Sequence, residues 1–259
     1  MKNIFSQMSA ERSANSLSAS CHPSRRNART SCPRSVVKII CTALFAALLA
    51  TDASAQTTFT TNITVNTAVP DNNPSGLASG FSLAGLDGAI TNLSVTLNLA
   101  GGYNGDLFAS LVGPGGFAVL LNRVGVSGGN PNGYGDTGLA VTFHTGAAPD
   151  IHGYGGGSFS ANGSGQVTGS WSADGRNISP LSAGSAFDLA GRTSLLDSFL
   201  GSSANGNWGL FIGDYSAGDI STLASYTVSL TTVPEPGTLA IFALGGAALL
   251  AGRRKNTAH

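Results

Sequence analysis

Short runs of alternating apolar and polar residues recur through the middle of the chain and constrain its fold more than any other feature. In Leu93–Leu99 the apolar side chains at every second position are separated by Ser94, Thr96 and Asn98. A period of two places all the apolar side chains on one face of a β-strand. The same alternation, or an apolar run of strand length, recurs in Phe59–Val65, Leu107–Val112, Phe117–Leu121, Leu139–Phe143, Trp208–Ile212 and Tyr226–Leu230.

Glycine lies between these runs and favours short strands joined by many turns. The chain has 36 glycines, about twice the usual frequency of roughly 7 %. Gly113-Pro114-Gly115-Gly116 separates two apolar runs and predicts a hairpin turn. We expect long loops over residues 145–186, with an edge strand near Gln166–Trp171, and one helical turn at Ser194–Leu200. The predicted fold is all-β, a jelly-roll-like β-sandwich.

The first 55 residues have the layout of a secretory signal peptide. Arg34 and Lys38 precede an apolar run over Ile39–Ala50, which predicts a signal helix. Ala53-Ser54-Ala55 is an A-x-A cleavage site, so signal peptidase is expected to cut before Gln56. The alternative is a retained membrane anchor, for which the run is short. The polar, Ser- and Arg-rich start is either an extended n-region or the product of a start codon placed too early.

A second apolar segment lies at the C-terminal end. Val233-Pro234-Glu235-Pro236 precedes the uncharged stretch Gly237–Gly252, and Arg253-Arg254-Lys255 follows it. About sixteen helical residues rise roughly 24 Å, and snorkelling basic side chains with local thinning can cover the remainder of a roughly 30 Å hydrocarbon core. The segment therefore predicts a single transmembrane helix with the basic cluster on the cytoplasmic side. The prolines and the basic stop disfavour a buried core helix.

These three parts, in this order, resemble the PEP-CTERM sorting signal of Gram-negative bacteria. The resemblance implies recognition by an exosortase, a membrane cysteine protease-transpeptidase, and cleavage near the Pro-Glu-Pro motif. It also implies an intermediate anchored in the inner membrane, then the cell surface, outer envelope or extracellular matrix, with exopolysaccharide or surface proteins as partners. The predicted organisation is a signal peptide over residues 1–55, a sandwich domain over 56–232 and a sorting signal over 233–259.

The charges and cysteines of the sandwich domain exclude several classes of protein. Residues 56–232 hold three Arg, no Lys, ten Asp and no Glu, so their net charge is about −7. Nucleic-acid binding needs clustered Lys and Arg against the phosphates, so we expect no nucleic-acid partner. Cys21, Cys32 and Cys41 all precede residue 56. Once the signal is removed, zinc fingers, redox pairs and cysteine nucleophiles are excluded.

A series of motifs spread over Ile90–Leu230 resembles the P domain (P/Homo B domain) that follows the catalytic domain of subtilisin-like proprotein convertases. The resemblance implies a jelly-roll sandwich of about eight strands that supports or binds something, without proteolysis of its own. The 145–186 loop is longer than that family usually has, and the aromatic expected near the end of the last strand is Tyr226. The motifs are Ile90–Leu97, Tyr103–Leu107, the Gly113–Gly116 turn, Val119–Leu121, Gly133–Asp136, Ala204–Leu210 and Gly218–Leu223.

The sandwich domain carries no recognisable set of catalytic residues. Asp136-Thr137-Gly138 is a D-T-G string, but no His-Gly-Thr, Gly-Thr-Ser, second D-T-G or G-x-S-x-G motif accompanies it. We interpret it as a turn beside a strand. His144 and His152 are expected at the surface or at strand ends, because they lack the spacing of a metal-binding helix.

Calcium is the ligand best suited to the aspartates. It takes six to eight oxygens, mostly carboxylate and backbone carbonyl, from flexible loops. Asp106 and Asp136 lie at Gly-flanked strand ends, and Asp214 and Asp219 follow the Trp208 strand closely. The alternative is that each carboxylate caps a turn by accepting from backbone N–H groups.

The sequence thus predicts an exported, sorted protein of the cell surface or matrix, whose sandwich is a non-catalytic binding or structural module and not an enzyme. The alternative is a secreted hydrolase, or an accessory domain of a protease, whose active residues are too scattered to recognise.

Overall fold

A computed structural model of the chain describes residues 55–146 and 148–234. The predicted signal helix and the predicted transmembrane helix lie outside these residues. Within the described ranges, none of the helices combines the length and apolar composition needed to cross a membrane.

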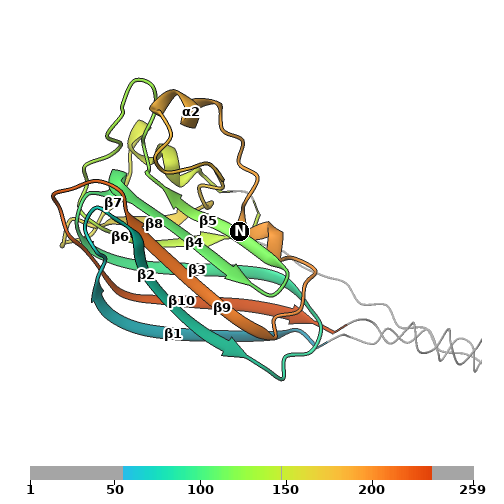
Figure 1. Ribbon diagram of the computed structural model, residues 1–259. Helices are drawn as coiled ribbons and strands as arrows, with labels where there is room; N and C mark the ends of the chain where they lie inside the picture. The colour runs from blue at the N-terminus through green and yellow to red at the C-terminus, as the bar shows by residue number, and fades with distance from the viewer. Residues whose placement is uncertain (1–54, 147, 235–259) are drawn as a thin grey trace, which may run out of the picture. The chain divides into compact units, whose positions relative to one another are not determined.

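Two β-sheets pack face to face (Figure 1). All neighbouring strands are antiparallel except β6 and β8, which are parallel. The first sheet has six strands in the order β1 (Thr57–Ala68), β10 (Ser221–Val233), β3 (Ala89–Gly101), β6 (Leu139–His144), β8 (Val167–Trp171) and β7 (Ser160–Ala161). The second has four in the order β2 (Asn73–Leu83), β9 (Gly206–Asp214), β4 (Leu107–Gly113) and β5 (Gly116–Asn122). The prediction of an all-β sandwich is confirmed; the jelly-roll topology stays a prediction.

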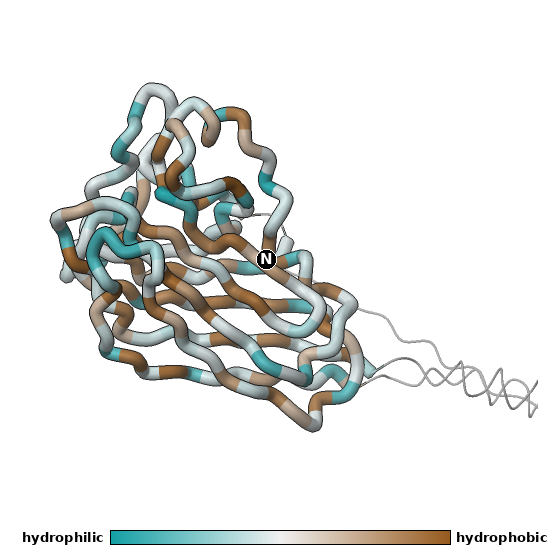
Figure 2. The backbone as a smooth tube through the Cα atoms, viewed as in Figure 1, coloured by the Kyte–Doolittle hydropathy of each residue, from teal (hydrophilic) through white to brown (hydrophobic). Residues whose placement is uncertain are grey.

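The apolar positions of the alternating runs meet between the sheets. Leu93 and Leu97 of β3, like Leu111 of β4, are fully buried, and burial of each such side chain contributes roughly 1.5–3 kcal/mol. The ring of Trp208 in β9 lies 5.1 Å from that of Phe199. Figure 2 shows brown segments alternating with paler ones along the strands, which is the period of two that the sequence predicts.

Two parts of the fold differ from the sequence prediction. Strand β2 was not predicted, because Asn, Pro, Gly and Ser dominate Asn73–Leu83 and hide its alternation. Strand β8 confirms the strand expected near residues 166–171, but it is not an edge strand, because β7 pairs with its free side.

Short helices fill the connections. The helical turn expected at Ser194–Leu200 is confirmed as η3 (Leu196–Phe199). The others are η1 (Asn104–Asp106), η2 (Ile151–Gly156) and α2 (Gly184–Leu189). Because η2, β7, β8 and part of α2 fall within residues 145–186, that stretch is more ordered than the long loops the sequence suggests.

The strand registers place the two ends of the described chain at one end of the sandwich. Thr57 of β1 pairs with Thr232 of β10, whereas Ala68 pairs with Thr222 at the other end of the same ladder. We call the end with Thr57 and Thr232 the terminal pole. The opposite end holds the β1–β2 turn and the β9–β10 loop.

Candidate functional site

Two aspartates lie on neighbouring strands at the end of the sandwich opposite the terminal pole. Asp106 ends η1 directly before β4, and Asp214 is the last residue of β9. Leu107 pairs with Asp214, and the Tyr215 N–H donates to the Asp106 carbonyl at 2.9 Å. The ladder therefore holds the two backbones next to each other.

The surroundings of Asp106 disfavour its charged form. Burial is the main cause that raises the pKa of Asp106 to about 6, and the charge of Asp214 adds to it. Arg123 acts in the opposite direction from 3.9 Å, the distance between its Nη2 and Asp106 Oδ1. Arg123 therefore compensates the negative charge of Asp106 only in part.

Asp214 is fully buried and incompletely hydrogen-bonded. Its Oδ1 accepts from the Ser216 N–H at 3.1 Å, whereas Oδ2 is buried without a hydrogen-bond partner. Burial raises the pKa of Asp214, and the N–H groups of Ser216 and Asn72 offset part of this, although neither bonds to Oδ2. A buried carboxylate oxygen without a hydrogen-bond partner destabilises the folded state. Oδ2 is therefore suited to bind a proton or a cation.

Two further aspartates complete what we call the acidic pole, defined by Asp71, Asp106, Asp214 and Asp219. Asp71 lies in the β1–β2 turn and accepts from the Gly218 N–H at 3.2 and 3.3 Å. Asp219 is exposed, and the charges of both residues raise the pKa of Asp106. Asp71 was missed in the sequence because its turn leads into β2, the strand that was not predicted.

Asp136 is engaged elsewhere. Its Oδ2 accepts from the Tyr154 hydroxyl at 2.9 Å, and its backbone carbonyl accepts from the Asn104 N–H. It is not among the charges that shift the pKa of Asp106. In the part of the chain that the structure describes, no three His, Cys, Asp or Glu side chains are grouped as a metal site.

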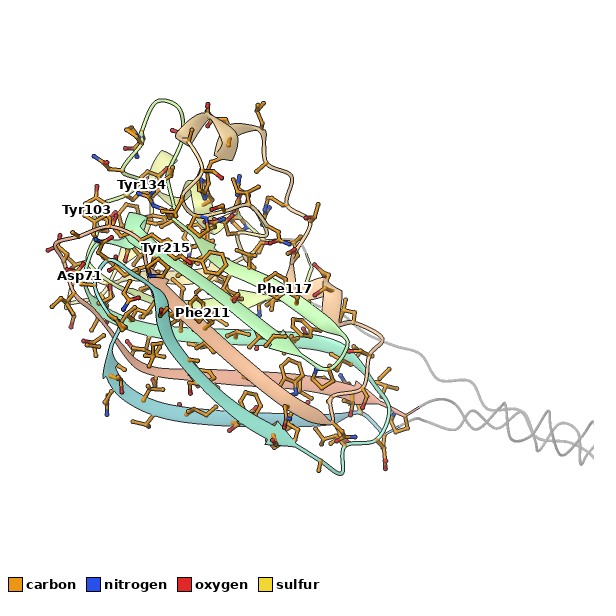
Figure 3. The ribbon with its side chains drawn as sticks, in the orientation of Figure 1. Asp71, Tyr103, Phe117, Tyr134, Phe211 and Tyr215 are labelled. Carbon is orange, nitrogen blue, oxygen red and sulfur yellow. The ribbon has the colours of Figure 1, made fainter. Side chains whose placement is uncertain are left out.

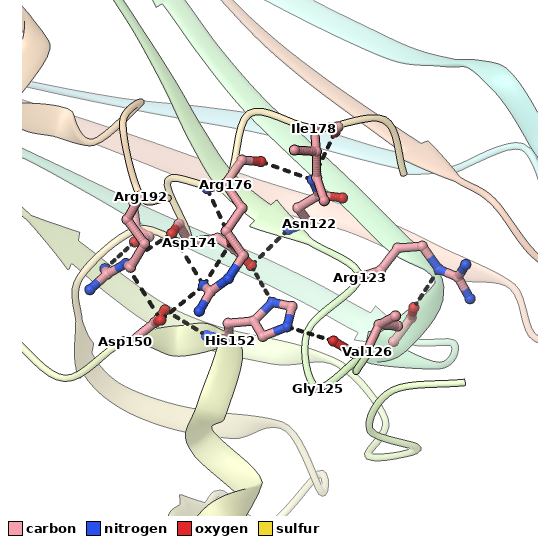
Figure 4. A network of polar contacts seen from close by, with 12 residues as sticks. Asn122, Arg123, Gly125, Val126, Asp150, His152, Asp174, Arg176, Ile178 and Arg192 are labelled. Atoms are coloured by element: carbon pink, nitrogen blue, oxygen red, sulfur yellow. Dashed lines mark hydrogen bonds and ion pairs between the residues drawn. The ribbon is translucent and has the colours of Figure 1, made fainter. Parts of the chain in front are cut away.

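A second polar cluster lies among the loops beside β5 (Figure 4). His152 is 8 % exposed, so the expectation that it lies at the surface or at a strand end is wrong. Its Nδ1 lies 2.7 Å from Asp174 Oδ2, and its Nε2 lies 3.0 Å from the Val126 carbonyl. Phe187 of α2 stacks on the ring. His144, by contrast, is half-buried at the end of β6, where it was expected.

Two arginines extend this cluster. Arg176 Nη1 lies 2.9 Å from Asp150 Oδ2 and 3.2 Å from Asp174 Oδ1. Arg192 donates to the carbonyls of Ala173 and Asp174. The cluster thus ties together η2 and the segments around residues 174 and 192.

The His152–Asp174 contact has the geometry of two members of a catalytic triad. In such a triad the second ring nitrogen faces the nucleophile. Here Nε2 faces the Val126 carbonyl, which can only accept a hydrogen bond and cannot attack a substrate. The arrangement is suited to holding loops together.

The outer surface of the four-stranded sheet has a shallow hollow of about 340 Å³. Ser110, Gly209 and Phe211 are among its lining residues. Phe211 also contacts Phe108, which meets Tyr215 edge to face. Figure 3 shows Phe211 and Tyr215 along this sheet, with Asp71 near its end.

Comparison with known proteins identifies the C-terminal region. The profile of the PEP-CTERM protein-sorting motif matches residues 232–255. The chain carries a PEP-CTERM sorting motif. This motif implies export, a membrane-anchored intermediate, processing by an exosortase and sorting to the cell surface. It begins at Thr232, within the last two residues of β10.

The solved structures that match the sandwich are distant from it in sequence. No curated protein matches the chain. Two crystal structures of a serine protease of Aeromonas sobria, one of them in complex with the chaperone ORF2, match at 16 % identity with TM-scores of 0.38 and 0.36. The matches cover 74 % of this chain but only 29 % and 30 % of the protease chains. The chain therefore spans about three tenths of the length of those proteins, and a TM-score this low supports no inference from them.

Proposed function

We propose that this protein is an exosortase-sorted component of the cell surface or extracellular matrix, whose P-domain-like sandwich is a non-catalytic binding or structural module. The proposal rests on the observation that the sandwich domain continues directly into the sorting motif. The motif starts where β10 ends, and β10 lies between β1 and β3 in the sheet. The folded domain is thus joined to the sorting signal through a central strand.

Mass spectrometry of both mature ends, after cell fractionation of the source bacterium, tests the proposal. We expect the envelope or matrix fraction to contain a chain that begins at Gln56 and ends near Pro234–Pro236. A Glu235→Ala, Pro236→Ala variant should accumulate in the inner membrane with its tail uncut. Intact, unprocessed chain dissolved in the cytosol would overturn the proposal.

The non-catalytic part of the proposal is supported by the contacts of His152. A hydrolase with an Asp–His pair needs the free ring nitrogen to activate a nucleophile, whereas a backbone carbonyl occupies that position here. The test is incubation with generic peptide and glycan substrates. Turnover that disappears in His152→Gln or Asp174→Asn, with the fold intact by circular dichroism, would establish the hydrolase alternative instead.

Calcium is the metal we propose for the acidic pole, with Asp106 and Asp214 as its carboxylate ligands and backbone carbonyls or water completing the shell. The unpaired Oδ2 of buried Asp214 supports this assignment. Asp71 and Asp219 add negative charge from the two adjoining loops. Asp136 is left out, because its carboxylate is engaged by Tyr154.

Thermal unfolding in millimolar calcium and in chelator tests this assignment, since a ligand of the native state must raise the melting temperature. We expect a rise of several degrees that is lost in Asp106→Asn. The control is Asp87→Asn, which removes the same charge from an exposed site at the terminal pole. No shift in the parent chain, or an equal shift in both variants, would exclude the site.

A further inference from the structure

The outward face of the six-stranded sheet is formed almost entirely by hydroxyl and amide side chains. Along β3, Ser94 and Thr96 alternate with the buried residues Leu93, Val95 and Leu97. The other strands repeat this alternation, and Ala100, Ala140 and His144 are outward residues of another type. We call the following set the hydroxyl face: Thr58, Thr60, Asn62, Thr64, Asn92, Ser94, Thr96, Asn98, Ala140, Thr142, His144, Thr168, Ser170, Ser225, Thr227, Ser229 and Thr231.

The strand registers arrange these side chains in rows. One row crosses five neighbouring strands through Asn62, Thr227, Thr96, Thr142 and Ser170. Neighbours in a row are about 4.8 Å apart, and successive rows are about 6.8 Å apart along the strands. Figure 1 shows β1, β10 and β3 side by side, which makes this a broad surface. Thr231 is its one buried side chain, so the described chain leaves the face open.

The hydroxyl face carries no Asp, Glu, Lys or Arg, although the domain around it is acidic. All ten aspartates of residues 56–232, and Arg123, Arg176 and Arg192, lie outside these strand positions. The charged residues lie in the acidic pole and in the loops instead. The face is therefore electrically neutral at its centre.

Hydrogen bonds between strands hold several of these side chains in place. The Thr96 and Thr142 hydroxyls are 2.9 Å apart, as are those of Thr60 and Ser229. A hydroxyl has one donor and two acceptor sites, so each pair keeps hydrogen-bonding capacity toward solvent. Because these side chains are already ordered, they lose less conformational entropy when a ligand binds.

These properties select the chemistry of a partner. A nucleic acid would need basic residues, and a membrane surface would need an apolar or basic face. A tightly bound protein would need buried aromatic or Arg anchors. A neutral polyhydroxylated chain needs what the face offers: groups that both donate and accept hydrogen bonds, repeated over a broad surface without charge.

We propose that the hydroxyl face binds a neutral polysaccharide. The proposal rests on the proposed function, because only an exported and sorted chain would meet such a polymer. Binding uses the hydroxyl rows and needs neither the acidic pole nor the hollow beside Phe211.

Retention of the purified full-length chain, in mild detergent, on insoluble polysaccharides tests the proposal. The neutral probes are microcrystalline cellulose, an insoluble β-1,3-glucan and starch granules, and the anionic probe is calcium-crosslinked alginate. We expect retention on at least one neutral polymer. That retention should be the same at about 50 mM and at about 500 mM salt, because no ion pair contributes to it. Retention on none of the three, or on alginate alone, would overturn the proposal.

The matched variants remove hydroxyls without changing side-chain volume much. Thr96→Val, Thr142→Val and Thr227→Val together remove the centre of one row, and we expect at least tenfold weaker retention, since each lost hydrogen bond weakens binding a few-fold. The control removes three exposed hydroxyls elsewhere through Ser75→Ala, Ser82→Ala and Thr193→Val. Equal retention of the two triple variants would also overturn the proposal. If both ends of the chain are cut normally in cells but the purified chain is not retained on a neutral polysaccharide, only the proposal for the hydroxyl face is refuted. If the chain is retained but its ends are not cut, only the sorting proposal is refuted.

Discussion

Thr57 and Thr232 face each other across the β1–β10 ladder, so the first and last strands of the sandwich begin and end at the same point. The expected signal-peptidase cut before Gln56 lies one residue ahead of β1, and the sorting motif starts within β10. Both cuts can therefore act on chain that leaves the sandwich at one pole. The acidic pole lies at the opposite end of the sandwich from Thr232, where the sorting motif begins.

The first prediction concerns the last residues of β10. A chain that ends after Pro234 keeps every pair of the β1–β10 ladder. A chain that ends after Leu230 loses buried Thr231 and Thr232 and their pairs with Thr58 and Thr57. We expect it to lose about 2 kcal/mol or more of unfolding free energy. Equal denaturant midpoints for the two chains would contradict this.

The second prediction concerns pH and Asp106. A folded-state pKa of about 6, raised from 3.8 mainly by burial, means that the folded state holds the proton more tightly than the unfolded state. This contribution to stability is complete below about pH 4 and is lost as the pH rises through 6, by up to about 3 kcal/mol. In chelator, the stability of Asp106→Asn relative to the parent chain should therefore increase between pH 4 and pH 7 and then level off. A difference that does not depend on pH would show that Asp106 is not perturbed.

The third prediction concerns the contact between His152 and Asp174. Asp174 is fully buried, and besides His152 it accepts from the N–H groups of Asn122 and Arg176. Asp174→Ala leaves these donors without a partner and removes the carboxylate oxygen that lies 3.2 Å from Arg176 Nη1. Breaking a buried charged pair typically costs 3–5 kcal/mol. Asp174→Asn should cost less, because the amide oxygen can still accept. Urea unfolding measures both.

The control for that comparison is Asp188→Ala. Asp188 accepts one hydrogen bond, from the Gly128 N–H, at an exposed site. We expect a loss below about 1 kcal/mol. If the Asp174 and Asp188 variants lost equal stability, the His152 cluster would not be what holds the loops together.

The sequence predicts the sandwich well where alternation is clean and poorly where turn-forming residues dominate. Leu93–Leu99 and Tyr226–Leu230 alternate without interruption, and both lie within long central strands. Asn73–Leu83 forms β2 because β9 offers it a partner and the core accepts Leu77 and Phe81. No local signal conveys this, since the pairing is between segments far apart in the sequence.

The sequence predicts the residues of the acidic pole only in part. Asp106 directly precedes the predicted strand Leu107–Val112, and Asp214 follows the predicted strand Trp208–Ile212, so sequence alone suggested them. Asp71 could be placed only once β2 was known, and Asp136 is diverted by Tyr154, a residue 18 positions away. The burial of His152 depends on α2 and on Asp174, which no sequence spacing relates to it.

The last prediction concerns close packing at the β4–β5 hairpin. A Cβ added at Gly116 would lie 2.2 Å from Cδ1 of Phe199, whose ring stacks on Trp208 in the core. Because that ring is held on both sides, Gly116→Ala forces the core to shift, and overpacking of this kind costs about 1–3 kcal/mol. The control is Gly129→Ala, where an added Cβ meets nothing within 4 Å. Thermal unfolding should show a lower melting temperature for Gly116→Ala alone, and adding Phe199→Leu should cost less in that background than in the parent chain, because the smaller side chain relieves the clash.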